Sequence, residues 1–252
     1  MKKIILSVCL FIIGMSAFAQ QDAETWFDQA NAAYNEGRYD TAMILYQSVL
    51  DADVESASLY CNMGDAQYKL RNYPMAIYYY EKALKLDPGY DDARHNLKIA
   101  NLAIVDKIEP VPQSFIARGW DKVKNLHATD GWAVLSLAFF ALLLISLFAF
   151  FRSRRMGLRK TGFFVAVLSL LLFAFSVIFA LQSHHDLQSH GAGIVMAPTV
   201  MVKSSPNESS VDLFVLHEGT KVEVMEESES WLKIKIANGS VGWMPSSSLA
   251  TL

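Results

Sequence analysis

The sequence predicts a multi-domain membrane protein made of an α-helical repeat solenoid, a two-helix transmembrane hairpin and a small all-β barrel. Three observations support this prediction. The N-terminal half repeats itself at a spacing of 34 residues, two uncharged apolar stretches follow, and the C-terminal part alternates apolar with polar side chains. Apolar residues make up 52 % of the 252 residues, more than a soluble globular chain usually needs.

Residues 1–19 have the order of a secretory signal peptide. Two lysines are followed by an apolar core and by Ala17-Phe18-Ala19, a small-x-small cleavage sequence. The core is shorter than the about 20 residues that a membrane span needs, which disfavours the alternative of an uncleaved anchor. The sequence therefore predicts that the segment after residue 19 is exported.

Residues 20–109 are predicted to form helical repeats closed by a capping helix. Residues 23–56 and 57–90 match one another, and the matching positions are aromatic or small, as closely packed antiparallel helices require. We expect the capping helix to run from Asp91 to about Lys107. The matching pairs are Trp26/Tyr60, Ala30/Gly64, Tyr34/Tyr68, Tyr39/Tyr73, Ala42/Ala76, Tyr46/Tyr80 and Leu50/Leu84.

This pattern resembles the tetratricopeptide (TPR) family, most closely in the second unit, which ends on Asp87-Pro88. The first unit departs from the family pattern at Gln29. The resemblance implies two antiparallel helices per unit and a groove that binds a peptide or protein without catalysis. A clamp for a peptide carboxylate is an alternative, but its lysine and arginine pattern is incomplete. The side chains implied to line the groove are Phe27, Asn31, Tyr34, Asn35, Cys61, Asp65, Tyr68, Lys69 and His95.

Residues 132–151 and 161–181 are predicted to be transmembrane helices. Each is uncharged and matches the ~30 Å thickness of the hydrocarbon core at about 1.5 Å per residue. Residues 152–160 between them carry five positive and no negative charges, so the positive-inside rule places this loop in the cytoplasm. Both flanking segments then face the opposite side, in agreement with the signal peptide. Trp132 is predicted to anchor the outer edge of the first span.

Residues 110–131 are predicted to be an amphipathic juxtamembrane linker, helical from Gln113 to Asp130. Two placements remain open for this helix, on the outer membrane surface or against the repeats. Residues 182–190 are predicted to be a flexible linker. Its three histidines lack further ligands at metal-binding spacing, so no metal site is predicted. They are His184, His185 and His190.

Residues 191–252 are predicted to fold as five or six short strands. Val222 and Val224 alternate with charged residues, and the same period of two recurs from Trp231 to Ala237. Asn238-Gly239 is predicted to form a two-residue hairpin turn.

From about Ile194 to Leu249 the residues resemble a bacterial SH3-like (SH3b) domain, most specifically in the turn followed by Gly242-Trp243. The resemblance implies binding of cell-wall peptides or proteins, usually without catalysis. Trp231 and Trp243 are candidates for an aromatic binding surface. The alternative is that at least one of these rings belongs to the core.

Composition and motifs exclude several functional classes. A formal net charge of −3 argues against a nucleic-acid-binding protein built on excess positive charge. Two cysteines are too few for a disulfide framework or a four-cysteine zinc module. No nucleotide-binding or hydrolase motif is present. The sequence therefore predicts no enzymatic activity, no cofactor and no nucleic-acid partner.

The order of the parts resembles the BatE-like family, the TPR proteins of the Bacteroides aerotolerance (Bat) operons. The resemblance implies von Willebrand-type membrane proteins and a MoxR-type ATPase as partners, and a role in aerotolerance or envelope stress. The predicted protein is a non-enzymatic, two-pass scaffold of the inner (cytoplasmic) membrane, in contact with the lipid bilayer and with both soluble domains in the periplasm. The alternative is a cell-wall sensor whose SH3b domain binds peptidoglycan.

Overall fold

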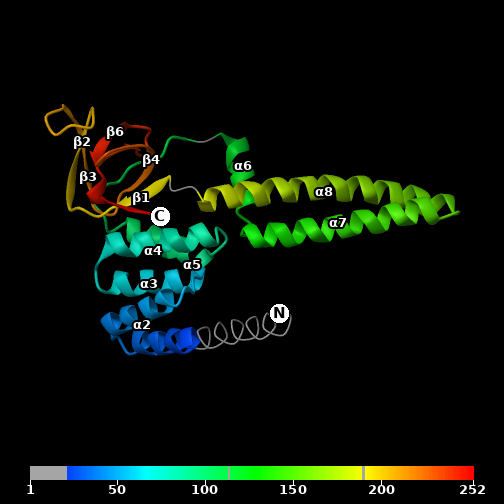
Figure 1. The fold of residues 1–252 in the computed structure, drawn as a ribbon, viewed down its shortest axis with the longest axis horizontal. Helices are drawn as coiled ribbons and strands as arrows, with labels where there is room; N and C mark the ends of the chain where they lie inside the picture. The colour runs from blue at the N-terminus through cyan, green and yellow to red at the C-terminus, as the bar shows by residue number, and fades with distance from the viewer. Residues whose placement is uncertain (1–21, 113, 189–190) are drawn as a thin grey trace, which may run out of the picture. The chain divides into compact units, whose positions relative to one another are not determined.

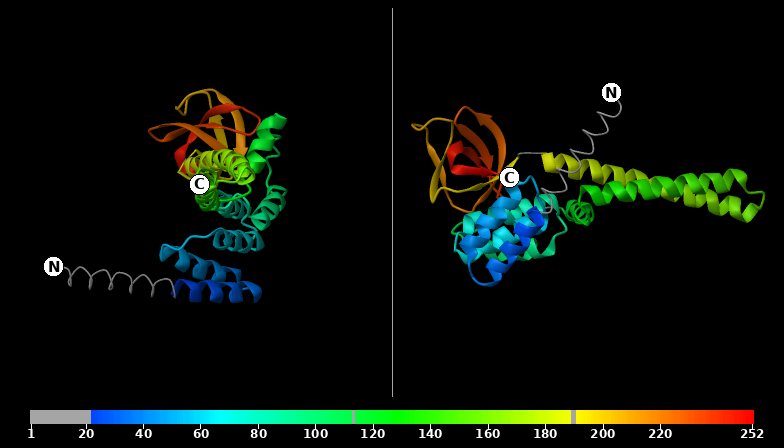
Figure 2. Two further views of the ribbon diagram at one scale, coloured as in Figure 1. Left: turned by 90° about the vertical axis from the view of Figure 1, so that its right-hand side faces the viewer. Right: turned by 60° about the horizontal axis from the view of Figure 1, so that its bottom comes forward.

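The computed structural model describes residues 22–112, 114–188 and 191–252, and the predicted signal peptide lies outside these ranges. The described residues form two compact units. One unit combines a helical repeat with an all-β domain, and the other contains three helices. Figures 1 and 2 show the elements of both units.

The helical part of the first unit consists of consecutive antiparallel helices, as predicted. Ser56 begins one of them as an N-cap, because its Oγ accepts a hydrogen bond of 3.1 Å from the amide of Leu59. Gly37 adopts a φ of +78° between the first two helices, a conformation that glycine adopts without steric cost. The helices are residues 22–35, α2 (Tyr39–Asp51), α3 (Ala57–Lys69), α4 (Tyr73–Leu86) and α5 (Asp91–Asn101).

Small residues bring these helices close together. A Cβ atom added to Gly64 would lie 2.5 Å from Cε1 of Tyr80, so the tyrosine ring occupies the space that the glycine leaves. Ala30, Ala42 and Ala76 are fully buried. The alternation of small and aromatic positions in the sequence therefore corresponds to the interhelical packing.

The capping helix α5 is shorter than predicted. It ends at Asn101, where the amides of Leu102 and Ala103 bond to carbonyls three residues earlier and tighten the last turn. Residues after this turn contact the β domain, and Asp106 accepts hydrogen bonds from it. The prediction of a helix to Lys107 was wrong because these tertiary contacts replace further helical hydrogen bonds.

The β domain is an antiparallel seven-stranded sheet, with one strand more than the upper predicted number. Its strand order is β3-β2-β6-β5-β4-β1-β7. Alternate residues of β5 and β6, among them Leu232, Ile234 and Met244, are buried in the domain core. The strands are β1 (Ala192–Val195), β2 (Thr199–Lys203), β3 (Asp212–His217), β4 (Lys221–Ser228), β5 (Trp231–Lys235), β6 (Val241–Pro245) and β7 (Leu249–Thr251).

The hairpin between β5 and β6 differs from the predicted two-residue turn. The amide of Ile236 donates to the carbonyl of Ser240, and the amide of Gly239 donates to the carbonyl of Ile236. Gly239 has a φ of +91°, whereas Asn238 is not among the residues with positive φ. A type I′ turn needs positive φ at both central residues. The connection is therefore a three-residue turn, Ala237-Asn238-Gly239, whose last residue is the glycine with positive φ.

The helical part and the β domain contact one another within the first unit. Asp106 accepts from the amide of His217 and from Thr220 Oγ1, both at 2.7 Å, and its Oδ1 lies 2.8 Å from His217 Nδ1. Lys221 of β4 pairs with Glu81 of α4 at 2.6 Å. Ile194 of β1 is fully buried and belongs to the core of the helical part. The β domain therefore has a core of its own, and Ile194 together with several polar contacts joins it to the helical part.

The second unit contains α6 (Phe115–Lys124), α7 (Thr129–Arg152) and α8 (Met156–Gln188). By length and apolar composition, α7 and α8 are able to cross a membrane. The predicted loop 152–160 is helical from Met156 onward, and residues 182–188, predicted to be flexible, continue α8. No proline or glycine interrupts residues 182–188, so the helix continues past the apolar segment.

Helix α6 packs against α8 through aromatic rings. The ring of Phe179 lies 4.9 Å from Trp120 and 4.8 Å from Trp132, measured between centroids. Lys124 pairs with Asp186 at 2.6 Å. Trp132 is only 8 % exposed, and its Nε1 donates to the carbonyl of Lys124. Trp132 is therefore a packing residue of this unit. Helix α6 contacts α8, a contact that the sequence analysis did not include.

Candidate functional site

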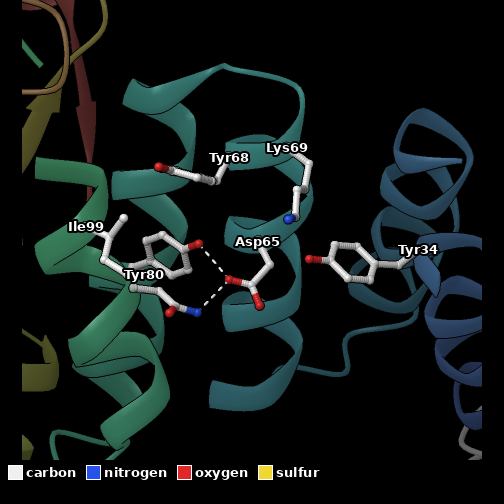
Figure 3. Close-up of a pocket in the computed structure, with 7 residues that line it drawn as sticks. Tyr34, Asp65, Tyr68, Lys69, Tyr80 and Ile99 are labelled. Carbon is white, nitrogen blue, oxygen red and sulfur yellow. Dashed lines mark hydrogen bonds between the residues drawn. The ribbon is translucent and has the colours of Figure 1, made fainter. Parts of the chain in front are cut away.

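The candidate site consists of two adjoining hollows on the helical repeats. The hollows measure about 250 and 370 Å³, and they share Tyr34 and Asp65. Figure 3 shows the first of them, with Asp65 on α3 between Tyr34 and Tyr80. The first hollow is lined by Tyr34, Asp65, Tyr68, Lys69, Tyr80, Asn96 and Ile99, and the second by Asn31, Tyr34, Asn35, Tyr46, Asn62 and Asp65.

A repeated hydrogen-bond pattern forms the floor of these hollows. In the second repeat, Asp65 Oδ1 accepts 2.6 and 2.8 Å hydrogen bonds from the Tyr80 hydroxyl and the Asn96 amide group. The corresponding bonds in the first repeat end on Asn31 Oδ1 and measure 2.7 and 2.9 Å. Their donors, Tyr46 and Asn62, lie 34 positions before Tyr80 and Asn96. Equivalent positions of the two repeats therefore form the same contacts.

The structure brings together most of the implied groove residues but not all of them. Cys61 is 3 % exposed and belongs to the core, and Phe27 packs on the ring of Tyr46 with centroids 6.0 Å apart. His95 is exposed on α5 and lines neither hollow. The implied residues that line the hollows are Asn31, Tyr34, Asn35, Asp65, Tyr68 and Lys69.

Sequence reasoning missed five lining residues. Two of them, Tyr46 and Tyr80, occupy packing positions in the sequence pattern, but their hydroxyl groups donate to Asn31 and Asp65 in the hollows. Asn62 and Asn96 are separated by the repeat length of 34, so the same self-comparison contains the signal that identifies them. The fifth is Ile99, which lies beyond the two complete repeats.

Burial sets the electrostatics of the groove. It raises the pKa of Asp65, although the hydrogen bonds from Tyr80 and Asn96 and the charge of Lys69 act in the opposite direction. Burial also raises the pKa of Tyr34 and raises that of Tyr46 to about 12. The tyrosines therefore remain neutral hydrogen-bonding groups at neutral pH.

We expect Cys61 to be unreactive in the folded protein. Its thiol is buried, and burial raises its pKa to about 12, so the reactive thiolate is scarce. In a Cys9→Ala background, iodoacetamide at pH 8 should label the folded chain roughly 100-fold more slowly than the chain in urea. Mass spectrometry measures the labelled fraction, and equally fast labelling in both states would contradict the buried position.

Trp231 and Trp243 lie on the outward face of the β domain. Their neighbours Leu232 and Met244 point into the core, and successive side chains of a strand point to opposite faces. Both rings are half-buried. Lys233 pairs with Trp243 across the strands and places its Nζ 5.8 Å from the ring centroid. The two tryptophans therefore present aromatic surface beside a cationic side chain.

Two of the three histidines of residues 182–190 lie in a helix rather than in the predicted flexible linker. His184 and His185 lie exposed on α8, and His190 is outside the described residues. Within residues 22–112, 114–188 and 191–252, no three histidine, cysteine, aspartate or glutamate side chains are grouped so that they could hold a metal ion.

Comparison with known families identifies both folded parts. A tetratricopeptide repeat model matches residues 57–90, and a bacterial SH3 domain model matches residues 198–250. The first unit is a TPR solenoid joined to an SH3-like domain. The chain is also 34 % identical over 82 residues, 32 % of its length, to tetratricopeptide repeat protein 12 of Homo sapiens. It spans only 12 % of the length of that relative.

Proposed function

We propose that this protein is a non-enzymatic scaffold of the inner membrane whose TPR groove and SH3-like domain bind protein partners. The observation that supports the proposal best is the groove itself. Two adjoining hollows lined by tyrosines, asparagines and Asp65 offer hydrogen-bond donors and acceptors beside aromatic surface. Such a lining suits a peptide segment, which presents both backbone polar groups and side chains.

The contact between the TPR solenoid and the SH3-like domain supports a common location for both. Asp106 and Lys221 form hydrogen bonds or ion pairs across this contact, and Ile194 is buried in it. Two domains that pack on one another lie on the same side of a membrane. A hairpin formed by α7 and α8 meets this requirement, because its two outer ends emerge on one side.

The charge pattern supports an orientation with both domains in the periplasm. Five positive charges lie between residues 152 and 160, at the turn of the hairpin. Positive residues in short loops remain on the cytoplasmic side of the membrane. The inner membrane is the proposed location, since the predicted signal peptide would export the TPR solenoid from the cytoplasm.

The proposed partners are the proteins of a Bat complex. A predicted signal peptide, TPR repeats, two apolar helices and an SH3-like domain follow one another in an order that resembles BatE-like proteins. We therefore propose von Willebrand-type membrane proteins as direct partners, with a MoxR-type ATPase in the same complex and a role in aerotolerance or envelope stress.

Cross-linking of the tagged full chain in native membranes, followed by mass spectrometry, tests this function. Tyr34→Ala should reduce recovery of von Willebrand-type proteins at least about 10-fold, because Tyr34 lines both hollows. Ile44→Ser is the matched control, since Ile44 is 69 % exposed on α2 and lines neither hollow. Equal recovery with both variants would exclude the groove as the binding surface.

A role in cell-wall binding is the second candidate function, and the outward position of Trp231 and Trp243 favours it. Aromatic rings beside Lys233 suit a ligand with apolar and anionic groups. We expect purified peptidoglycan sacculi to retain the detergent-solubilised full chain and to retain Trp243→Ala at most weakly. Absence of retention of the unaltered protein would exclude this candidate.

A further inference from the structure

Asp65 and Asn31 occupy the same position in consecutive repeats and differ in charge. Each accepts one hydrogen bond from a tyrosine hydroxyl and one from an asparagine amide, at distances that differ by only 0.1 Å between the repeats. The first repeat therefore shows that a neutral side chain satisfies both donors. The negative charge at position 65 is not required by this hydrogen-bond pattern.

The charge at position 65 also carries a cost for the fold. Burial favours the neutral form of the Asp65 carboxyl group and raises its pKa. Asparagine would fulfil the structural role without this cost, as Asn31 does. The observation calls for a function of the charge beyond the packing of the repeats.

Asp65 lies where a ligand can reach it. It lines both hollows, and both of its hydrogen bonds end on Oδ1. In Figure 3 the second carboxylate oxygen of Asp65 is directed away from the Tyr80 hydroxyl, and the Tyr34 side chain faces Asp65, whereas the Tyr68 side chain points away from it. Among the lining residues, Asp65 and Lys69 carry the charges, and Lys69 is exposed at the rim.

We propose that the TPR groove binds a partner segment through one cationic side chain, a lysine or an arginine, which pairs with Asp65 beside the ring of Tyr34. This inference rests on the proposed function of the groove. A carboxylate near tyrosine rings binds a cation through both ionic and cation–π attraction. The same carboxylate repels an acidic segment, which disfavours a clamp for a peptide carboxylate.

The charge of the whole TPR region supports this choice of ligand. Residues 20–109 contain 15 acidic and 8 basic residues, a net charge of −7. A surface of one sign attracts a segment of the opposite sign and increases its rate of association. Lys69 opposes the attraction locally, so its removal should strengthen binding.

A random dodecapeptide library displayed on phage tests the proposal against the purified full chain in detergent. We expect enrichment of lysine or arginine at one fixed position of the selected peptides. A selected peptide should bind Asp65→Asn about 10- to 100-fold more weakly, as expected for loss of a charge-assisted hydrogen bond. Replacing the basic residue of the peptide by citrulline or norleucine should weaken its binding to the unaltered protein. The same replacement should have little effect on binding to Asp65→Asn, because the ion pair is already absent there.

The melting temperature of Asp65→Asn separates a role in binding from a role in folding, and two further variants test the charge of the groove. Asp65→Asn should melt at the same or a higher temperature than the unaltered chain, whereas a merely structural role predicts a lower one. Asn31→Asp should strengthen binding of the basic peptide, and Lys69→Gln should do the same.

Enrichment of acidic or uncharged peptides, or unchanged binding by Asp65→Asn, would overturn the inference and leave the groove function intact. Enrichment of no peptide would overturn the groove function as well.

Discussion

Replacing Tyr80 by alanine should lower the free energy of unfolding of the TPR solenoid by about 3–5 kcal/mol. The Tyr80 side chain is only 1 % exposed, and its ring lies over Gly64, where it fills the space between α3 and α4. The substitution removes this apolar surface and leaves a cavity that the neighbouring glycine cannot fill. It also removes the hydroxyl group that donates to Asp65, a half-buried acceptor.

Chemical denaturation of the full chain in detergent, followed by circular dichroism, measures this effect. Tyr80→Phe retains the ring and loses only the hydroxyl group, so its cost should be about 1–3 kcal/mol. Tyr78→Ala is the positional control, because Tyr78 is adjacent in sequence but only half-buried. An equal cost for Tyr78→Ala and Tyr80→Ala would contradict the packing of Tyr80 against Gly64.

Asp106→Ala should separate the SH3-like domain from the TPR solenoid. The carboxylate accepts hydrogen bonds from the His217 amide and the Thr220 hydroxyl, and it lies within 2.8 Å of the His217 ring. Its side chain is 14 % exposed, so water replaces these bonds poorly. One hydrogen bond to a charged acceptor contributes about 1.5–3 kcal/mol to stability. We expect Asp106→Ala to weaken the contact between the two domains by at least about 3 kcal/mol, because more than one such bond is lost.

Hydrogen exchange of the full chain measures the separation. The amide of His217, which donates to Asp106, should exchange at least about 10-fold faster in Asp106→Ala, whereas the core of β5 should keep its protection. Asp186→Ala is the matched control, since Asp186 is also an ion-paired aspartate but lies in the second unit. Unchanged exchange in Asp106→Ala would show that apolar contacts around Ile194 suffice.

The same contact should depend on pH in the acid range. Burial by itself would raise the pKa of Asp106, but the hydrogen bonds and the charge of His217 outweigh it, so the pKa is lowered. A lowered pKa means that the ionised carboxylate is favoured in the folded state. The contact is therefore at full strength above the ordinary aspartate pKa and is lost as the pH falls through the lowered value. Asp106→Asn should remove this dependence.

Local patterns determined most of the architecture. A repeat of 34 residues, two uncharged apolar stretches and an alternation of period two predicted the helical solenoid, the long apolar helices and the β domain, because each element shows its own periodicity in the sequence. Six of the nine implied groove residues line the hollows for the same reason, since the resemblance fixes their positions within the repeat. Four of the five remaining lining residues act through hydroxyl and amide groups whose partners are 15 and 31 residues away, and the fifth is Ile99.

By itself, the sequence determined which segments become helices and strands, since side-chain spacing over a few residues decides which face of an element is apolar. Only the tertiary structure decided where α5 ends, that Cys61 and Trp132 are buried, and that Asp106 joins the SH3-like domain to the solenoid. Asp106 and His217 are 111 residues apart, and no local pattern relates them. Such contacts form only when folding brings distant surfaces together, and the resulting free energy then overrides local preference, as it does at the end of α5.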